Sequence, residues 1–360
     1  MLLRNSRVLL SRLLLLFLVV PALAQNTTPG EAFPSAVPSP PPAKPTPPSA
    51  GGSSSRGQSA QSSADEQEGS FLFHKEVDEV VLHATVVDDK QHIITNLDRT
   101  AFTVYEDGKP QNIVSFRHED IPVAMGVVID NSGSMREKRE KVNKAAINLV
   151  KASNPQDEVF IVNFNDEYYL DQDFTNNLSK LKEALEKVET RGGTALYDAA
   201  VASADHLKKY AKLDKKVLFV VTDGEDNASR ESLEQAIRRL QEENGPAVYA
   251  IGLLGEEKQR RARKALQFIA EKTGGIAFFP KSLDEVDAIS QQVAHDIRNQ
   301  YTMVYKPSNP KTSGGYRAIK VDAKAKGFGK LMVRTKSGYY AGEERAADTT
   351  SGDPSRPANR

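Results

Sequence analysis

The chain has 360 residues, with 48 basic and 48 acidic side chains, no cysteine and no tryptophan. Its length suffices for two or more domains, and a hydrophobic share of 39% is enough for a packed core diluted by polar segments. Balanced charge without a basic block argues against nucleic-acid binding through phosphate contacts. The lack of cysteine excludes a disulfide scaffold, a cysteine-ligated zinc site and a thiol nucleophile.

The first 24 residues have the pattern of a secretory signal peptide. Three arginines precede the apolar run 13–20, Pro21 ends that run, and residues 22–24 form a small-x-small cleavage site. Because the run is shorter than the roughly 20 residues of a membrane-spanning helix, we expect cleavage before Gln25. The alternative is an uncleaved anchor helix. The mature protein is then expected to be secreted or periplasmic, with no membrane span.

Two segments have the composition of disordered chain. Residues 25–70 are rich in proline, serine and glycine and contain almost no β-branched or aromatic side chains. Such a segment cannot bury enough apolar surface to offset its conformational entropy, so we expect a disordered linker. Residues 342–360 are expected to form a second disordered tail.

Two β-rich segments, 71–120 and 300–341, flank the centre of the chain. β-Branched and alternating patterns predict strands, with a turn at Asp107-Gly108, over residues 80–87, 102–105, 113–116, 301–305, 318–323, 331–333 and 339–340. Neither segment has enough strands to close a core by itself. We therefore expect the two to form one immunoglobulin-like β-sandwich into which the central part is inserted; the alternative is two independent β appendages.

The centre, residues 121–299, alternates short apolar strands with helical periodicity. Strands are predicted over residues 123–129, 159–164, 217–221, 248–253 and 276–279. Nearly continuous apolar strands that alternate with helices predict an α/β, Rossmann-like fold, in which helices cover both faces of a mostly parallel sheet. Folds of this kind bind ligands at the carboxyl ends of their strands.

Polar residues gather at these strand ends. Asp130, Ser132 and Ser134 follow the first strand, Thr194 follows a glycine pair at the start of a predicted helix, and Asp223 ends the strand 217–221. All five offer oxygen, and oxygen-only ligation selects Mg²⁺, Mn²⁺ or Ca²⁺. With at most two carboxylates, the ion would favour a further anionic oxygen, for which an Asp or Glu of a protein partner is the natural source.

Each part of this pattern has a simpler alternative. Ser134 and Glu137 could form a capping box, Thr194 could be an N-cap, and Asp223 with Gly224 could form a turn. Separately these explanations suffice. Together they do not explain why all five polar groups are expected at one sheet edge, which favours a metal site.

The spacing Asp130-x-Ser132-x-Ser134, followed by a distant Thr194 and a distant Asp223, resembles the metal-ion-dependent adhesion site of the von Willebrand factor type A domain. The resemblance covers residues 121–299. It implies that Ser132 and Ser134 are direct ligands, that Asp130 binds directly or through water, and that Thr194 and Asp223 exchange roles between states.

The flanks carry a second resemblance. Residues 102–111, with Phe116 and with residues 316–317 and 338–340, are similar to the secreted bacterial von Willebrand factor A-related family common in Acidobacteria. This similarity indicates the arrangement of the domains more than the function of the protein.

These patterns predict a secreted, metal-dependent protein-binding module, for adhesion or complex assembly, that binds an acidic partner residue through a divalent cation. The alternatives are a metal-stabilised structural envelope protein and a metal-dependent hydrolase. An enzyme is not expected, because the sequence has no H-E-x-x-H, nucleophile-elbow or phosphate-loop motif, and its six histidines are scattered. Only Glu225 is a candidate general base near the predicted site.

Overall fold

A computed structural model describes residues 79–187, 189–254 and 260–342. The expected signal peptide, the linker 25–70 and the tail beyond residue 342 lie outside these ranges. Within the described ranges, no helix has both the length and the apolar character that crossing a membrane requires.

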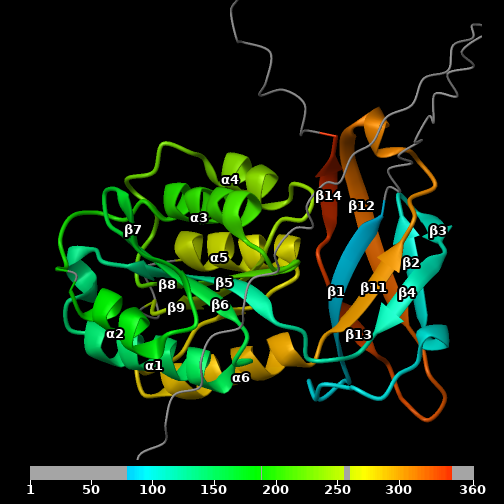
Figure 1. Ribbon diagram of the computed structural model, residues 1–360, viewed down its shortest axis with the longest axis horizontal. Coiled ribbons are helices and arrows are strands. Elements are labelled where there is room, and N and C mark those ends of the chain that lie inside the picture. Colours follow the sequence, from blue (N-terminus) through cyan, green and yellow to red (C-terminus); the bar gives the residue numbers. More distant parts are fainter. Residues whose placement is uncertain (1–78, 188, 255–259, 343–360) are drawn as a thin grey trace, which may run out of the picture. The chain divides into compact units, whose positions relative to one another are not determined.

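The centre of the chain forms a six-stranded sheet with the order β10-β9-β8-β5-β6-β7 (Figure 1). Five strands are parallel: β5 (Val123–Asp130), β6 (Glu158–Phe164), β8 (Lys215–Thr222), β9 (Ala247–Gly252) and β10 (Ala277–Phe278). The sixth, β7 (Tyr168–Thr175), runs antiparallel to β6 at the sheet edge and was not among the predicted strands.

Helices cover both faces of this sheet (Figure 1). One face packs against α1 (Arg139–Ala152), α2 (Leu178–Glu186) and α6 (Glu285–Arg298). The other packs against α3 (Leu196–Tyr210), α4 (Leu233–Leu240) and α5 (Arg260–Thr273). This arrangement confirms the predicted α/β, Rossmann-like fold class.

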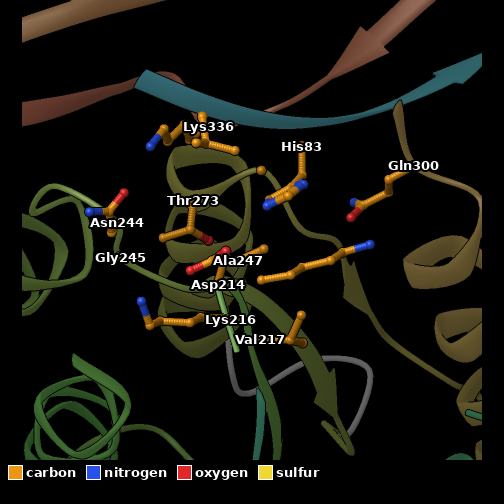
Figure 2. Close-up of a pocket in the computed structure, with 13 residues that line it drawn as sticks. His83, Asp214, Lys216, Val217, Asn244, Gly245, Ala247, Thr273, Gln300 and Lys336 are labelled. Atoms are coloured by element: carbon orange, nitrogen blue, oxygen red, sulfur yellow. The ribbon is translucent and has the colours of Figure 1, made fainter. Parts of the chain in front are cut away.

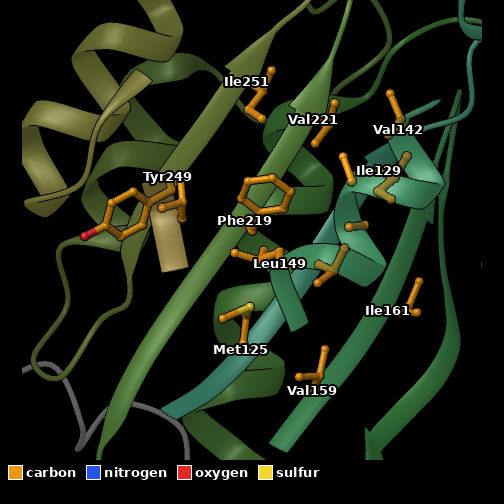
Figure 3. Close-up of a cluster of buried hydrophobic side chains, with 14 of the residues drawn as sticks. Met125, Ile129, Val142, Leu149, Val159, Ile161, Phe219, Val221, Tyr249 and Ile251 are labelled. Atoms are coloured by element: carbon orange, nitrogen blue, oxygen red, sulfur yellow. The ribbon is translucent and has the colours of Figure 1, made fainter. Parts of the chain in front are cut away.

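The central strand β5 shows why the sequence forms these layers. All eight of its residues are buried, and successive side chains of a strand point to opposite faces. Met125 and Ile129 pack into the cluster beside α1, where Figure 3 shows them with Val142 and Leu149. Val128 packs into the cluster on the other face. A strand that is apolar on both faces needs a helical cover on each side.

The flanking segments form two four-stranded sheets, with the orders β13-β1-β11-β4 and β14-β12-β2-β3. Their strands are β1 (Val80–Val87), β2 (Phe102–Glu106), β3 (Lys109–Gln111), β4 (Ile113–Arg117), β11 (Tyr301–Tyr305), β12 (Gly315–Ala323), β13 (Met332–Arg334) and β14 (Gly338–Ala341). Each sheet combines strands from both segments, since β1 pairs with β11 and β2 pairs with β12. The two sheets share one hydrophobic cluster.

A buried carboxylate links these two sheets. Glu106 on β2 is 2% exposed and accepts hydrogen bonds from the hydroxyls of Tyr305 at 2.5 Å and Tyr339 at 3.1 Å. Arg317 on β12, itself 1% exposed, donates to the other carboxylate oxygen at 3.1 Å. A buried charge is tolerated only with such partners, so this network ties both β segments together.

Candidate metal centre

The carboxylate of Asp130 fixes the loop that follows β5. Its Oδ1 accepts from the backbone N–H of Ser132 at 2.7 Å, and its Oδ2 accepts from the hydroxyl of Thr222 at the end of β8 at 2.6 Å. The residue is fully buried. Burial raises the pKa of Asp130, and the nearby negative charge of Asp223 adds to the increase.

Three further oxygen atoms, from Ser132, Ser134 and Asp223, form a chain of contacts between this loop and the end of β8. The hydroxyl oxygens of Ser132 and Ser134 are 3.1 Å apart, and the Ser134 hydroxyl donates to Oδ1 of Asp223 at 2.8 Å. Asp223 follows the last residue of β8, the strand that pairs directly with β5. Neighbouring parallel strands therefore bring two motif parts into contact although they are about 90 residues apart in sequence.

Thr194 comes from a third loop, whose conformation is fixed by Asp166. The Asp166 carboxylate accepts from the backbone N–H of Gly193 at 2.8 Å. Gly192 has φ +73°, and a Cβ there would lie 2.0 Å from an Asp166 oxygen, so the position requires glycine. The side chain of Asn227 accepts from the Thr194 N–H at 2.9 Å, which joins this loop to the one after β8.

Neither Ser134 nor Thr194 acts as a helix cap. Ser134 and Glu137 do not form the capping box considered above, because a short 3₁₀ turn covers Gly133–Met135 and α1 begins only at Arg139. The N-cap of α3 is Ala195, without a side-chain cap bond. The capping alternatives therefore do not account for these two hydroxyl groups.

An open pocket lies where the three loops meet. Ser134, Thr194 and Asp223 line it, whereas Asp130 and Ser132 do not. The structure thus brings all five predicted residues to one sheet edge but divides them into three that line the pocket and two that support it. Glu225 and Asp226 also line the pocket. The Asp226 carboxylate accepts from the Tyr197 N–H at 2.9 Å, near the start of α3, which places it at the positive end of that helix.

Lys138 was not among the predicted site residues, yet its ammonium group pairs with Oδ2 of Asp223. The Asp223 side chain is 0% exposed and that of Lys138 is 29% exposed. The pair shows that the pocket already attracts a positive charge. The available signal was a lysine four residues after Ser134, one turn along a helix, although α1 itself begins just beyond it.

The donor set fits a hard cation. It consists of hydroxyl oxygens and the carboxylate of Asp223, backed by Asp130, and it includes neither sulfur nor nitrogen. In the residues that the structure describes, there is no group of three or more His, Asp or Glu side chains that could hold a metal. The candidate therefore depends on neutral hydroxyl oxygens to complete the coordination.

Part of the α/β region is similar to a known protein family. Residues 125–225 match the family described as the von Willebrand factor type A domain. Within the α/β part, residues 125–225 are thus similar to a type A domain. No curated protein matches the chain.

Solved structures are similar to the chain at low identity. A von Willebrand factor type A protein from Catenulispora acidiphila is 14% identical, with a TM-score of 0.43, over 76% of each chain. BatB from Bacteroides thetaiotaomicron is 20% identical, with a TM-score of 0.39, over 48% of this chain and 98% of its own. The PilB minor pilin from Streptococcus sanguinis is 15% identical, with a TM-score of 0.42, over 50% of this chain and 62% of the pilin chain. The match thus spans less than two thirds of that pilin.

Proposed function

We propose that this protein is a metal-dependent protein-binding module that acts in the periplasm or outside the cell, in adhesion or in complex assembly. In this proposal Ser132, Ser134 and Thr194 contribute hydroxyl oxygens, and Asp130 and Asp223 contribute carboxylate oxygens directly or through water. Mg²⁺ is the expected ion, with Mn²⁺ or Ca²⁺ as alternatives. When bound, this cation would supply an open coordination position for an Asp or Glu carboxylate of a protein partner.

The contact between the Ser134 hydroxyl and Asp223 carries the proposal. These groups are 2.8 Å apart and line an open pocket together with Thr194. Oxygen donors from three separate loops thus line one open pocket, although only Ser134 among them is exposed. Each hydroxyl is oriented by its own loop rather than used as a helix cap, which leaves its lone pairs available to a cation.

A hydrolase is the second candidate, and it would need a general base beside a metal-activated water. Glu225 lines the pocket, and its carboxylate lies 3.8 Å from the guanidinium of Arg261. Its side chain is 43% exposed. An ion pair at the solvated rim favours a role in partner recognition. We therefore expect a hydrolase screen to remain blank with and without Mg²⁺.

Calorimetric titration with Mg²⁺ and Mn²⁺ tests the site itself. Asp130→Ala is expected to remove most of the affinity, because it removes a full negative charge and frees the loop that positions Ser132. Ser134→Ala should weaken binding less, since one neutral oxygen is lost. Ser308→Ala, in the β part, is the matched control and should bind as the parent does. Unchanged binding in Asp130→Ala would place any metal elsewhere.

Partner binding is tested by capture from the native envelope in Mg²⁺ or in EDTA. The proposal expects capture in Mg²⁺ that is lost in EDTA and in Ser134→Ala. If the metal raises the melting temperature while capture stays the same in EDTA, the site is only structural and the binding proposal fails.

A further inference from the structure

A second pocket lies at the opposite end of β8 from the candidate metal site, where this strand begins (Figure 2). Residues of both the α/β part and the β part line it. Lys215 and Lys216 come from the first two positions of β8, His83 comes from β1, and Lys336 comes from the connection between β13 and β14. The side-chain amide of Asn244 belongs to the same lining.

The lining has more positive than negative charge. Three of its side chains are lysines, and Asp214 is its single carboxylate. Lys215 is 3% exposed and donates to the backbone carbonyl of Ile297. Within the described part of the chain, neither Lys216 nor Lys336 forms an ion pair with a carboxylate. Buried or partly buried ammonium groups are normally paired, and a single carboxylate in the lining leaves the three lysines with an excess of positive charge.

The three ammonium groups all act on His83, and Lys216 also acts on Lys336. Burial lowers the pKa values of Lys215 and Lys336 to about 8. The pKa of His83 is lowered to about 3, mainly by burial and then by the charges of Lys215, Lys336 and Lys216. The imidazole is therefore neutral near pH 7, and its Nδ1 lies 3.1 Å from the hydroxyl of Thr302. All three lysines line this one pocket.

We propose that this pocket is a binding site for a small oxyanion with at least two negative charges, of the phosphate or sulfate class. Such an anion presents several acceptor oxygens to ammonium groups that each have three donors and no acceptor. It would bridge Lys336 of the β part to Lys215 and Lys216 of the α/β part. Its charge would offset the repulsion and the desolvation that these lysines otherwise carry. The inference does not depend on the metal site.

The simpler alternative is that the pocket binds no ligand, and that the lysines reduce their mutual repulsion by losing protons. The two explanations differ in their response to anions. A ligand site stabilises the folded protein in proportion to ligand occupancy, whereas an empty cluster responds only to ionic strength.

The test is thermal unfolding and calorimetry of the full mature chain in phosphate, sulfate, malonate or chloride at equal ionic strength. We expect phosphate or sulfate at saturation to raise the melting temperature by about 2–4 °C over chloride. In the double variant Lys216→Met/Lys336→Met this rise should vanish, and affinity for phosphate should fall at least tenfold. Lys180→Met/Lys264→Met, which removes two exposed lysines from helices, is the matched control and should keep the response.

Several outcomes would overturn the inference. Equal melting temperatures in phosphate, sulfate and chloride would show an empty cluster. A response that persists in the double variant would place the anion elsewhere. A response to malonate without one to phosphate or sulfate would contradict the ligand class. If the double variant does not fold, calorimetry of the single variant Lys216→Met, at a partly exposed position, decides the same question. Unchanged affinity for phosphate in this variant would overturn the inference.

Discussion

Lys138 and Asp223 form an ion pair in the candidate metal pocket, and the lysine contacts the carboxylate oxygen that Ser134 leaves free. The pair links the residue before α1 to the loop after β8. A divalent cation that enters this pocket must share Asp223 with the ammonium group. Lys138 is therefore expected to compete with metal rather than to assist it.

Replacing Lys138 with methionine should raise the affinity for Mg²⁺ by about three- to tenfold, because a like charge near the cation is removed while the side-chain volume is kept. Calorimetric titration measures this change. Lys141→Met is the matched control, since that lysine pairs with the exposed Asp284 and should leave the affinity unaltered. Weaker binding in Lys138→Met would show that the lysine supports the site.

Truncation of Glu106 should destabilise the β part strongly. Glu106→Ala leaves Arg317 charged and buried, and it removes the acceptor of the hydroxyls of Tyr305 and Tyr339. We expect a loss of about 3–5 kcal/mol in the free energy of unfolding, measured by urea denaturation. Asp322→Ala removes a carboxylate from the surface of β12 and should cost less than about 0.5 kcal/mol. Similar costs for both variants would mean that the buried network adds little.

Gly126 in β5 has no space for a side chain. A Cβ there would lie 2.4 Å from Cζ of Phe160 and 2.6 Å from Cδ2 of Leu218. Gly126→Ala should therefore cost about 1–3 kcal/mol in the free energy of unfolding, because the two neighbours must shift in a packed core. Gly329→Ala is the control, since a Cβ there meets nothing within 4 Å. An undiminished stability in Gly126→Ala would contradict the close packing of β5.

Lys336 should make stability depend on pH between about 8 and 10.5. Burial lowers its pKa from 10.5 to about 8 in the folded chain, while Glu243 opposes this decrease and Lys311 and Lys216 add to it. Below pH 8 the lysine is charged in both the folded and the unfolded chain, so the full free-energy cost of burying its charge is present. As the pH rises above 8, the unfolded chain retains more protons and the cost is relieved.

The variant Lys336→Met should accordingly be more stable than the parent at pH 7, and this advantage should shrink by pH 10. Urea denaturation in chloride buffers at several pH values measures the difference. Lys264→Met, which alters an exposed position of α5, should show no such trend. An advantage that grows with pH would mean that the charge of Lys336 is stabilised in the fold.

Local sequence patterns predicted most of the elements and the fold class. Residues 80–87 and 301–305 were predicted as strands and coincide with β1 and β11. The turn at Asp107-Gly108 has positive φ at both residues, as its sequence indicated. These features could be read because each depends on side-chain periodicity or on the backbone preference of one or two residues. The five oxygen-bearing residues could also be identified from their spacing in the sequence, although metal binding at them stays a prediction.

Other features depended on contacts between distant residues. Strand β7 is mostly exposed, so it has no apolar alternation, and its pairing with β6 makes it a strand. Lys138 meets Asp223 across 85 residues, and Glu106 meets Tyr305 across 199. The lysines of the second pocket come from different parts of the fold. Charged and hydroxyl groups have no period that indicates their partners, because the partner of each is decided by which strands become neighbours after the apolar faces are buried.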